Sequence, residues 1–253
     1  HPENAVSISN QTESQATSQP VATTAPRVQI ARLDAALESI ALEIRQRQTN
    51  SARTKLDNYR LEHPESPQAT FLLGLTYHRD QKYGQALPYY DEATRLDPTY
   101  EIVQHFKGWA LYYLGQLDES RECFERFLEL HPDDYDSWFA LGLIDLDEDE
   151  IDKAQQHFNE SLRLLAALGK NADAKAISKA HTRLSEVYER RDNLEEAAHQ
   201  LTMAMQLYPD HYEAAYKLSR ILVKLGRTED AKRAYDQYII ARERVRPGMS
   251  SPE

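Results

Sequence analysis

The residues that could bind a metal ion are an acidic run near position 150 and nine histidines. The run from Asp145 to Asp152 places carboxylates at alternate positions, as the first half of a calcium-binding loop does. Glu150 stands where such a loop needs glycine, and Gln156 replaces the bidentate acid. We therefore interpret the run as a solvated acidic turn between two helices, or as a patch for a basic partner, and expect no metal site.

The histidines form no HExxH motif and no pair at i, i+4. His78 and His105 are candidates to lie near each other, but two imidazoles without a third ligand do not make a zinc site. Cys123 is the only cysteine, which excludes an intramolecular disulfide and a multi-cysteine zinc site. We expect Cys123 to be a small packing residue, and we expect no cofactor.

Catalytic and nucleotide-binding motifs are absent from the sequence. There is no G-x-S-x-G, GxxxxGK(S/T) or GxGxxG, and no set of residues suggests a nucleophile, a base and an oxyanion donor. The chain of 253 residues has a net charge of −11, which disfavours binding to a phosphate backbone. No apolar run approaches the roughly 18 residues of a membrane span. The sequence predicts a non-enzyme without a nucleic-acid partner or a membrane span.

Helices must position any functional surface, because the chain has only 8 glycines and few β-branched runs, which argues against a large sheet. Pro64, Pro98 and Pro132 recur at intervals of 34 residues, and Pro209 follows later in the same sequence context. Proline cannot continue a helix but fits at its start. Each of these prolines is therefore expected to end one helical segment and to begin the next.

Small and large apolar residues recur in phase with the prolines. The stretch Trp138-x2-Leu141-Gly142 followed by Ala154-x3-Phe158 resembles the tetratricopeptide repeat, which has a 34-residue period. The resemblance covers about residues 33–245. It implies pairs of antiparallel helices that stack because no pair can bury its apolar face alone. The expected fold class is all-α, a right-handed superhelical solenoid whose first helices line a concave groove.

The period divides the chain into an array over residues 30–246 and two tails. About six units are expected, at 33–66, 67–100, 101–134, 135–177, 178–211 and 212–245. Nine extra residues, about Gly169 to Ile177, lengthen the fourth unit and resemble the extended-helix repeat of kinesin-light-chain-like arrays. We expect them to shift the stacking and to separate a front part (33–168) from a back part (178–245). Pro88 predicts a kink or a late start in a second helix.

The tails, residues 1–29 and 247–253, are expected to be disordered. The first is rich in Ser, Thr, Gln and Pro and lacks the large apolar residues that could offset the entropy lost on ordering. Such a tail suits the spacer behind a cleaved signal or a membrane anchor, which favours an exported, periplasmic or membrane-tethered location. A truncated cytoplasmic protein is the alternative.

The resemblance also identifies groove positions, because in this family the residues flanking the small-residue position of each first helix face the groove. In the front half these are apolar, aromatic or histidine: Phe71, Leu75, His78, Ile102, His105, Trp109, Tyr112, Phe139 and Leu143. In the back half they are mostly charged: Lys179, Thr182, Glu186, Glu189, Glu213, Tyr216, Arg220 and Val223. An exposed apolar and aromatic stripe usually marks a binding surface.

We therefore expect a protein-interaction scaffold or assembly factor that binds a peptide or amphipathic helix of another protein in the front groove. Two alternatives stay open for the groove: packing within the array could bury several of these side chains, or the chain's own tail or residues 30–48 could fill it. The second function is a structural subunit of a larger complex, such as an envelope or membrane-associated one, with the groove permanently occupied. A homo-oligomer is also left open.

One known use of such arrays is to grip the C-terminal carboxylate of a peptide with Lys, Asn and Arg side chains. Apolar residues hold these positions in the front groove, so that clamp is absent there. Lys179 and Arg183 could supply a fragment of it without the accompanying Asn.

Overall fold

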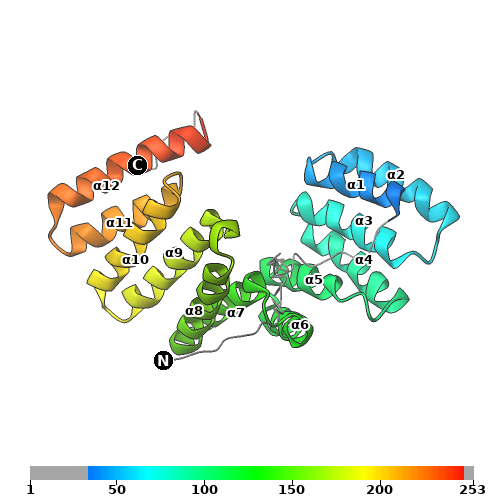
Figure 1. Ribbon diagram of the computed structural model, residues 1–253, viewed down its shortest axis with the longest axis horizontal. Coiled ribbons are helices and arrows are strands. Elements are labelled where there is room, and N and C mark those ends of the chain that lie inside the picture. Colours follow the sequence, from blue (N-terminus) through cyan, green and yellow to red (C-terminus); the bar gives the residue numbers. More distant parts are fainter. Residues whose placement is uncertain (1–33, 248–253) are drawn as a thin grey trace, which may run out of the picture.

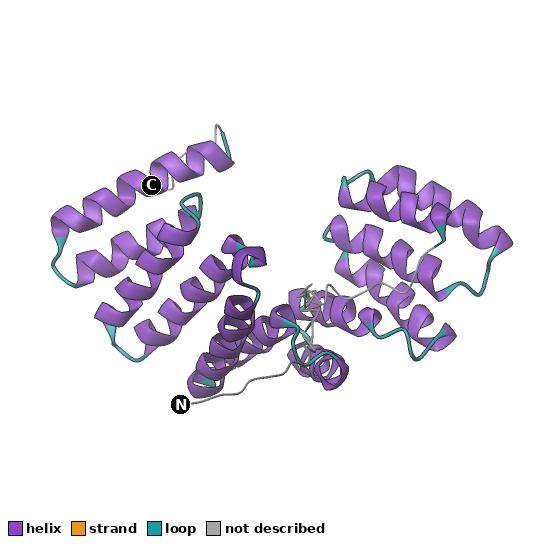
Figure 2. Cartoon of the chain, viewed as in Figure 1, coloured by secondary structure: helices purple, strands orange, loops and turns teal. Residues whose placement is uncertain are grey.

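The computed structural model describes residues 34–247, and in that part of the chain twelve α-helices follow one another without a strand (Figure 2). Consecutive helices form six hairpins. The hairpins are α1 (Ala35–Arg45) with α2 (Thr49–Glu62), α3 (Pro67–Arg79) with α4 (Tyr83–Leu96), α5 (Ile102–Tyr113) with α6 (Leu117–Leu130), α7 (Tyr135–Asp147) with α8 (Ile151–Ala167), α9 (Ala174–Arg190) with α10 (Leu194–Leu207), and α11 (Tyr212–Lys224) with α12 (Thr228–Val245).

The hairpins stack side by side into a curved array (Figure 1). Helices α1–α4 form one arm, α9–α12 form the other, and α5–α8 lie at the bend between them. Each helix packs mainly on its neighbours in sequence, and the first helices of the first five hairpins also contact one another in succession, from α1 to α9. The predicted all-α solenoid is thus confirmed.

The turn inside every described hairpin has the same backbone geometry. A residue with positive φ follows each first helix, and the next amide donates to a carbonyl five residues earlier, as Lys82 N does to Tyr77 O at 2.9 Å. This is the hydrogen bond of a Schellman motif, which favours glycine. Glycine occupies only two of the six positive-φ positions, which are Arg47, Gln81, Gly115, Asp149, Asp192 and Gly226.

The turns between hairpins are set by proline and by polar caps. Pro64, Pro98, Pro132 and Pro209 each lie two residues after the last residue of a second helix. The next first helix often begins on a side chain that accepts a backbone N–H. The Asp134 carboxylate, for example, accepts from Ser137 N at 2.8 Å.

The two helices of three hairpins approach closely at a glycine. A Cβ placed at Gly74, Gly108 or Gly142 would lie within 3.0 Å of the ring of Tyr90, Phe124 or Phe158, respectively. All three rings are fully buried. The glycines are needed because the facing aromatic ring occupies the space that a larger residue would require.

Two sequence expectations about irregularities change in the structure. Pro88 lies inside α4, which begins at Tyr83, so the late helix start is wrong. The nine extra residues are taken up by 17-residue helices α8 and α9 and by a short 3-10 helix, Gly169–Asn171. A buried cluster joins Phe158 of α8 to Leu184 and Val187 of α9, so the apolar core continues across the junction.

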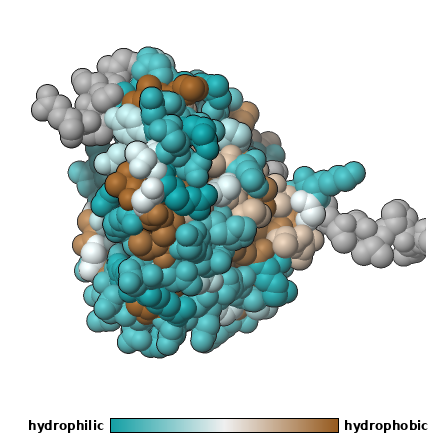
Figure 3. All heavy atoms as spheres, turned by 90° about the vertical axis from the view of Figure 1, so that its left-hand side faces the viewer, coloured by the Kyte–Doolittle hydropathy of each residue, from teal (hydrophilic) through white to brown (hydrophobic). Residues whose placement is uncertain are grey.

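The tail predicted at 1–29 and most of the one predicted at 247–253 lie outside the described residues. The face of the array that carries the C-terminal hairpins is mostly hydrophilic, with smaller hydrophobic areas between the polar ones (Figure 3). None of the helices described is long and apolar enough to cross a lipid bilayer.

Candidate functional site

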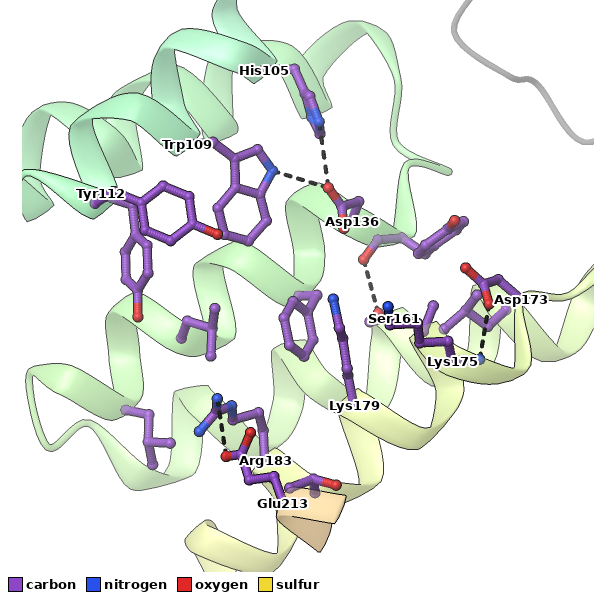
Figure 4. Close-up of a pocket in the computed structure, with 18 of the residues that line it drawn as sticks. His105, Trp109, Tyr112, Asp136, Ser161, Asp173, Lys175, Lys179, Arg183 and Glu213 are labelled. Carbon is purple, nitrogen blue, oxygen red and sulfur yellow. Dashed lines mark hydrogen bonds and ion pairs between the residues drawn. The ribbon is translucent and has the colours of Figure 1, made fainter. Parts of the chain in front are cut away.

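A cavity of about 730 Å³ lies on the concave side of the array. Its lining comes mainly from the first helices α5, α7 and α9, with contributions from α3, α8 and the start of α11. The helices of one wall carry aromatic side chains and those of the other carry charges (Figure 4). The cavity therefore includes part of the predicted front groove and part of the predicted back groove.

Hydrogen bonds hold the aromatic wall in place. The indole Nε1 of Trp109 donates to Asp136 Oδ2 at 3.0 Å, and the hydroxyl of Tyr112 donates to Asp147 Oδ2 at 2.9 Å. The two rings meet edge to face, with centroids 5.9 Å apart. Phe139 lines the same wall and is half-buried. Each ring thus presents apolar surface to the cavity while its polar atom, where it has one, is already satisfied.

His105 carries a positive charge at the edge of this wall. Its Nδ1 lies 3.5 Å from Asp134 Oδ2, and its Nε2 lies 3.4 Å from Asp136 Oδ2. Burial alone would lower the pKa of His105, but the two carboxylates raise it to about 9. Asp136 therefore holds both His105 and Trp109, which fixes two lining residues through one side chain (Figure 4).

The opposite wall comes from α9 and contains two lysines that are not ion-paired. Arg183 pairs with Glu186 at 2.6 Å and approaches Glu213 at 3.6 Å. Neither Lys175 nor Lys179 forms an ion pair through its side chain within residues 34–247, and both are exposed. Figure 4 shows Lys179 rising from α9 into the cavity.

Six of the nine predicted groove residues line this cavity, and three do not. The six are His78, His105, Trp109, Tyr112, Phe139 and Leu143. The expected exposure of the other three is wrong, because Phe71, Leu75 and Ile102 are only 0%, 7% and 6% exposed. The ring of Phe71 packs against Tyr100 and Phe106, with centroids 5.5 and 5.4 Å away. The stacking of successive hairpins buries this part of the stripe.

His78 is a neutral counterpart to His105. Burial, followed by the charges of Arg79 and His105, lowers the pKa of His78 to about 4. The ring of His78 packs edge to face with the ring of Phe106, and the two centroids are 5.9 Å apart. The ring of His105 also packs edge to face with Phe106, at a centroid distance of 5.3 Å. The two histidines are thus close, as expected. No group of three metal-ligating side chains occurs among the residues described.

The acidic run does not form a loop with converging carboxylates. Asp145 is fully buried inside α7, where its carboxylate meets Arg121 at 2.9 Å and His157 Nδ1 at 2.5 Å. Asp147 accepts from Tyr112, and Asp149 is the positive-φ residue of the turn. The run is therefore partly structural: it ties α6, α7 and α8 together and positions one cavity side chain.

Sequence reasoning missed several lining residues. Asp136 and Tyr135 lie at the start of α7, Tyr113 ends α5, and Lys175 lies in the first turn of the lengthened α9. Asp136 and Lys175 both lie in the first turn of a first helix, α7 and α9 respectively, and both line the cavity. This shared position is the signal by which they could have been predicted as lining residues.

Comparison with known proteins identifies the repeat. Two family models, both described as tetratricopeptide repeat, match the chain, one over residues 41–101 and 107–168 and the other over 188–243. Together the matches cover more than two thirds of the chain. The chain belongs to the tetratricopeptide repeat family. Arrays of this family are protein-interaction scaffolds that generally lack catalytic groups, and this chain has that architecture.

Relatives of this tetratricopeptide repeat protein match only in part. It is 24% identical over 162 residues to anaphase-promoting complex subunit 3 of Schizosaccharomyces pombe, a match that covers 64% of this chain and 23% of the relative. The chain spans less than a quarter of the length of the curated relatives it matches.

Solved structures show the same fold. Pseudomonas aeruginosa PilF has a TM-score of 0.66 at 18% identity, covering 85% of this chain and 92% of PilF. YrrB, described as a tetratricopeptide repeat protein with an unusual peptide-binding site, has a TM-score of 0.53 at 18% identity, covering 74% of this chain and 91% of YrrB. At these identities the likeness concerns the fold.

Proposed function

We propose that the concave cavity binds a segment of a partner protein, a short peptide or one face of an amphipathic helix. The segment inserts an apolar or aromatic side chain against Trp109, Tyr112 and Phe139. A neighbouring Asp or Glu of the segment pairs with Lys175 or Lys179. The observation that carries the proposal is the arrangement of one hydrogen-bonded aromatic wall opposite two lysines without ion pairs.

Three features support this assignment over a purely structural role for the cavity. The rings of Trp109, Tyr112 and Phe139 are only half-buried, and aromatic residues in concave sites dominate binding energetics. Their conformations are already fixed by hydrogen bonds and ring contacts, so little order is lost on binding. The chain as a whole has a net charge of −11 and would repel an acidic segment. Lys175 and Lys179 provide a local positive charge that attracts such a segment to the cavity.

Selection from a library of random short peptides tests the proposal. The expected result is enrichment of sequences with a large apolar residue next to Asp or Glu. Trp109→Ala and Phe139→Ala should each weaken binding of a selected peptide by about 2 kcal/mol, roughly 30-fold. Lys179→Glu should weaken acidic peptides more than neutral ones.

Matched controls lie outside the cavity. Leu61→Ala and Leu130→Ala also truncate exposed apolar side chains, at 82% and 57% exposure, and should leave binding unchanged. Equal affinity of the Trp109 and Phe139 variants and the parent chain would show that the cavity is not the binding site.

A second candidate function is a fixed subunit of a larger complex, with the cavity occupied throughout its life. The observation in its favour is that the relative named above is itself named as a complex subunit. Purification separates the two functions: a fixed subunit co-purifies with its neighbour in constant proportion, whereas a scaffold is recovered alone and binds its partner on addition.

A further inference from the structure

His211 connects the α9 wall of the cavity to the next hairpin. It lies in the turn between α10 and α11, and it lines the same cavity as Lys175 and Lys179. Its Nδ1 lies 2.7 Å from the hydroxyl of Ser178, which directly precedes Lys179 on α9. This hydrogen bond holds the imidazole of His211 beside the part of α9 that carries both lysines.

The hydrogen bonds of Ser178 determine which nitrogen of His211 can take up a proton. The Ser178 hydroxyl donates to Ala204 O of α10 at 2.8 Å, so its oxygen accepts from Nδ1 of His211. Nδ1 therefore carries the proton of the neutral ring, and Nε2 has the lone pair. Protonation at Nε2 leaves both hydrogen bonds of Ser178 intact, so His211 can become charged without breaking the contacts between α9 and its neighbours.

Charged groups on α9 and α11 act on His211 in opposite directions. Burial is the main cause that lowers the pKa of His211 from its ordinary value. Glu213 in the first turn of α11 favours a charged ring, whereas the positive charges of Lys179, Arg183 and Lys175 on α9 disfavour it. The cations that would attract an acidic segment are thus the same ones that oppose protonation of His211.

The remaining titratable neighbours belong to the same turn and to α12. The ring of Tyr208 lies 6.3 Å from that of His211, measured between centroids. Asp210 directly precedes His211, and its carboxylate is paired with Arg244 of α12 at 2.6 Å. The carboxylate of Asp210 is therefore already neutralised by a partner, and the α9 cations and Glu213 are left to set the local charge.

The other two histidines of the described cavity lining keep their charge state around neutral pH. The pKa of His105 is about 9 and the pKa of His78 is about 4, so between pH 5.5 and 7.5 the first stays positive and the second stays neutral. An Asp or Glu of a bound segment stays ionised over that range, because its ordinary pKa is about 4. Within this lining, His211 is the histidine whose charge can respond to pH there.

We propose that binding of an acidic segment in the cavity is coupled to protonation of His211. This inference rests on the proposed function. A carboxylate that pairs with Lys175 or Lys179 offsets the repulsion between these lysines and a protonated His211, and it adds an attraction of its own. His211 then takes up a proton from solvent on binding. By linkage, the acidic segment binds more tightly as pH falls from 7.5 to 5.5.

A charge reversal at one lysine tests the coupling without a partner. Lys179→Glu places a carboxylate next to Ser178 and should raise the titration midpoint of the His211 imidazole, followed by NMR, by about half a pH unit or more. The resonance of His211 is identified by its loss in His211→Gln. Lys82→Glu makes the same charge change in the turn between α3 and α4, on the other arm of the array (Figure 1), and should leave the midpoint unchanged. Equal midpoints in the parent chain and in Lys179→Glu would overturn the inference.

The second experiment measures the affinity of a selected acidic peptide at pH 7.5 and at pH 5.5. The parent chain should bind this peptide at least about threefold more tightly at pH 5.5. A matched peptide with Asn or Gln in place of the acidic residue should show no such gain. His211→Gln should bind the acidic peptide with the same affinity at both pH values. His199→Gln alters a histidine that lies in a different cleft, on α10, and should keep the gain.

The outcomes distinguish this inference from the proposed function. A peptide that binds in the cavity with equal affinity at both pH values, or a gain that persists in His211→Gln, would overturn the inference and leave the proposed function standing. If no peptide is found whose binding depends on Trp109 and Phe139, the proposed function fails, and the inference that rests on it fails as well.

Discussion

Gly142 lies directly against the ring of Phe158: a Cβ at residue 142 would come within 2.6 Å of its Cε1. Real Cβ contacts are longer, so any side chain at this position forces the two helices of the hairpin apart. The same relationship joins Gly108 to Phe124. In these hairpins the facing aromatic ring therefore leaves no room for a side chain larger than that of glycine.

Gly142→Ala is expected to lower the free energy of unfolding by about 1–3 kcal/mol, because it overpacks a buried contact. Thermal and urea unfolding would measure the loss. Gly84→Ala is the control: no atom lies within 4 Å of the added Cβ, and alanine in a helix should raise stability by roughly 0.5–1 kcal/mol. A stabilising Gly142→Ala would contradict the close approach.

Gln81→Gly is expected to stabilise the chain. Gln81 has φ of 59°, in the left-handed region, which costs a non-glycine residue roughly 1–2 kcal/mol. Glycine removes that cost but adds freedom to the unfolded chain, so a net gain of up to about 1 kcal/mol is expected. Gly115→Ala, at φ of 75° in the equivalent turn, should destabilise. Urea unfolding midpoints that move in the same direction for both variants would contradict this account.

Two of the histidines that line the cavity are expected to titrate at opposite extremes. The pKa of His105 is raised from 6.5 to about 9, so its stabilising charge is fully present below pH 6.5 and is lost as pH rises through 9. The pKa of His78 is lowered from 6.5 to about 4, so its contribution is present above pH 6.5 and is lost as pH falls toward 4.

Imidazole proton resonances followed by NMR would give both midpoints directly. Replacing Asp136 with Asn should lower the His105 midpoint, because one of the two carboxylates that hold its proton is removed. Two midpoints near the ordinary histidine value would contradict the arrangement.

Cys123 is expected to be unreactive toward thiol reagents in the folded chain. It is buried on α6, and burial raises the pKa of its thiol to about 11, so the nucleophilic thiolate is scarce at neutral pH. Labelling with a chromogenic disulfide should be slow in buffer and fast in urea. Rapid labelling in buffer would show that α6 opens far more often than its packing suggests.

The sequence was sufficient to predict the repeat and half of the cavity, for a physical reason. The 34-residue period arises from the residues that pack the two helices of each hairpin against each other. These contacts are close in sequence and recur in every hairpin. The burial of Phe71, Leu75 and Ile102 depends on how far each hairpin overlaps the next, which the period does not encode. Trp109 and Tyr112 line the cavity and are half-buried, and their polar atoms donate hydrogen bonds to Asp136 and Asp147.

The positive-φ turns escaped prediction for a different reason. Glycine marks the turn at Gly115 and Gly226, but Gln81 and Asp149 fill the same backbone conformation without a residue type that favours it so strongly. Gln81 and Asp149 could have been identified only by aligning the repeats, because they occupy the same repeat position as Gly115 and Gly226. Lys175 could not be placed because it lies within the lengthened unit, where the 34-residue period is interrupted.

The stacking of each hairpin mainly on its neighbours also has a mechanical consequence. No long-range strand pairing braces the described array, so a small rotation at each interface adds to the next along the superhelix. The aromatic wall on α5 and α7 and the lysine wall on α9 belong to three successive hairpins. The width of the cavity is therefore set by the rotations at the interfaces between these three hairpins, and not by the structure of any single helix.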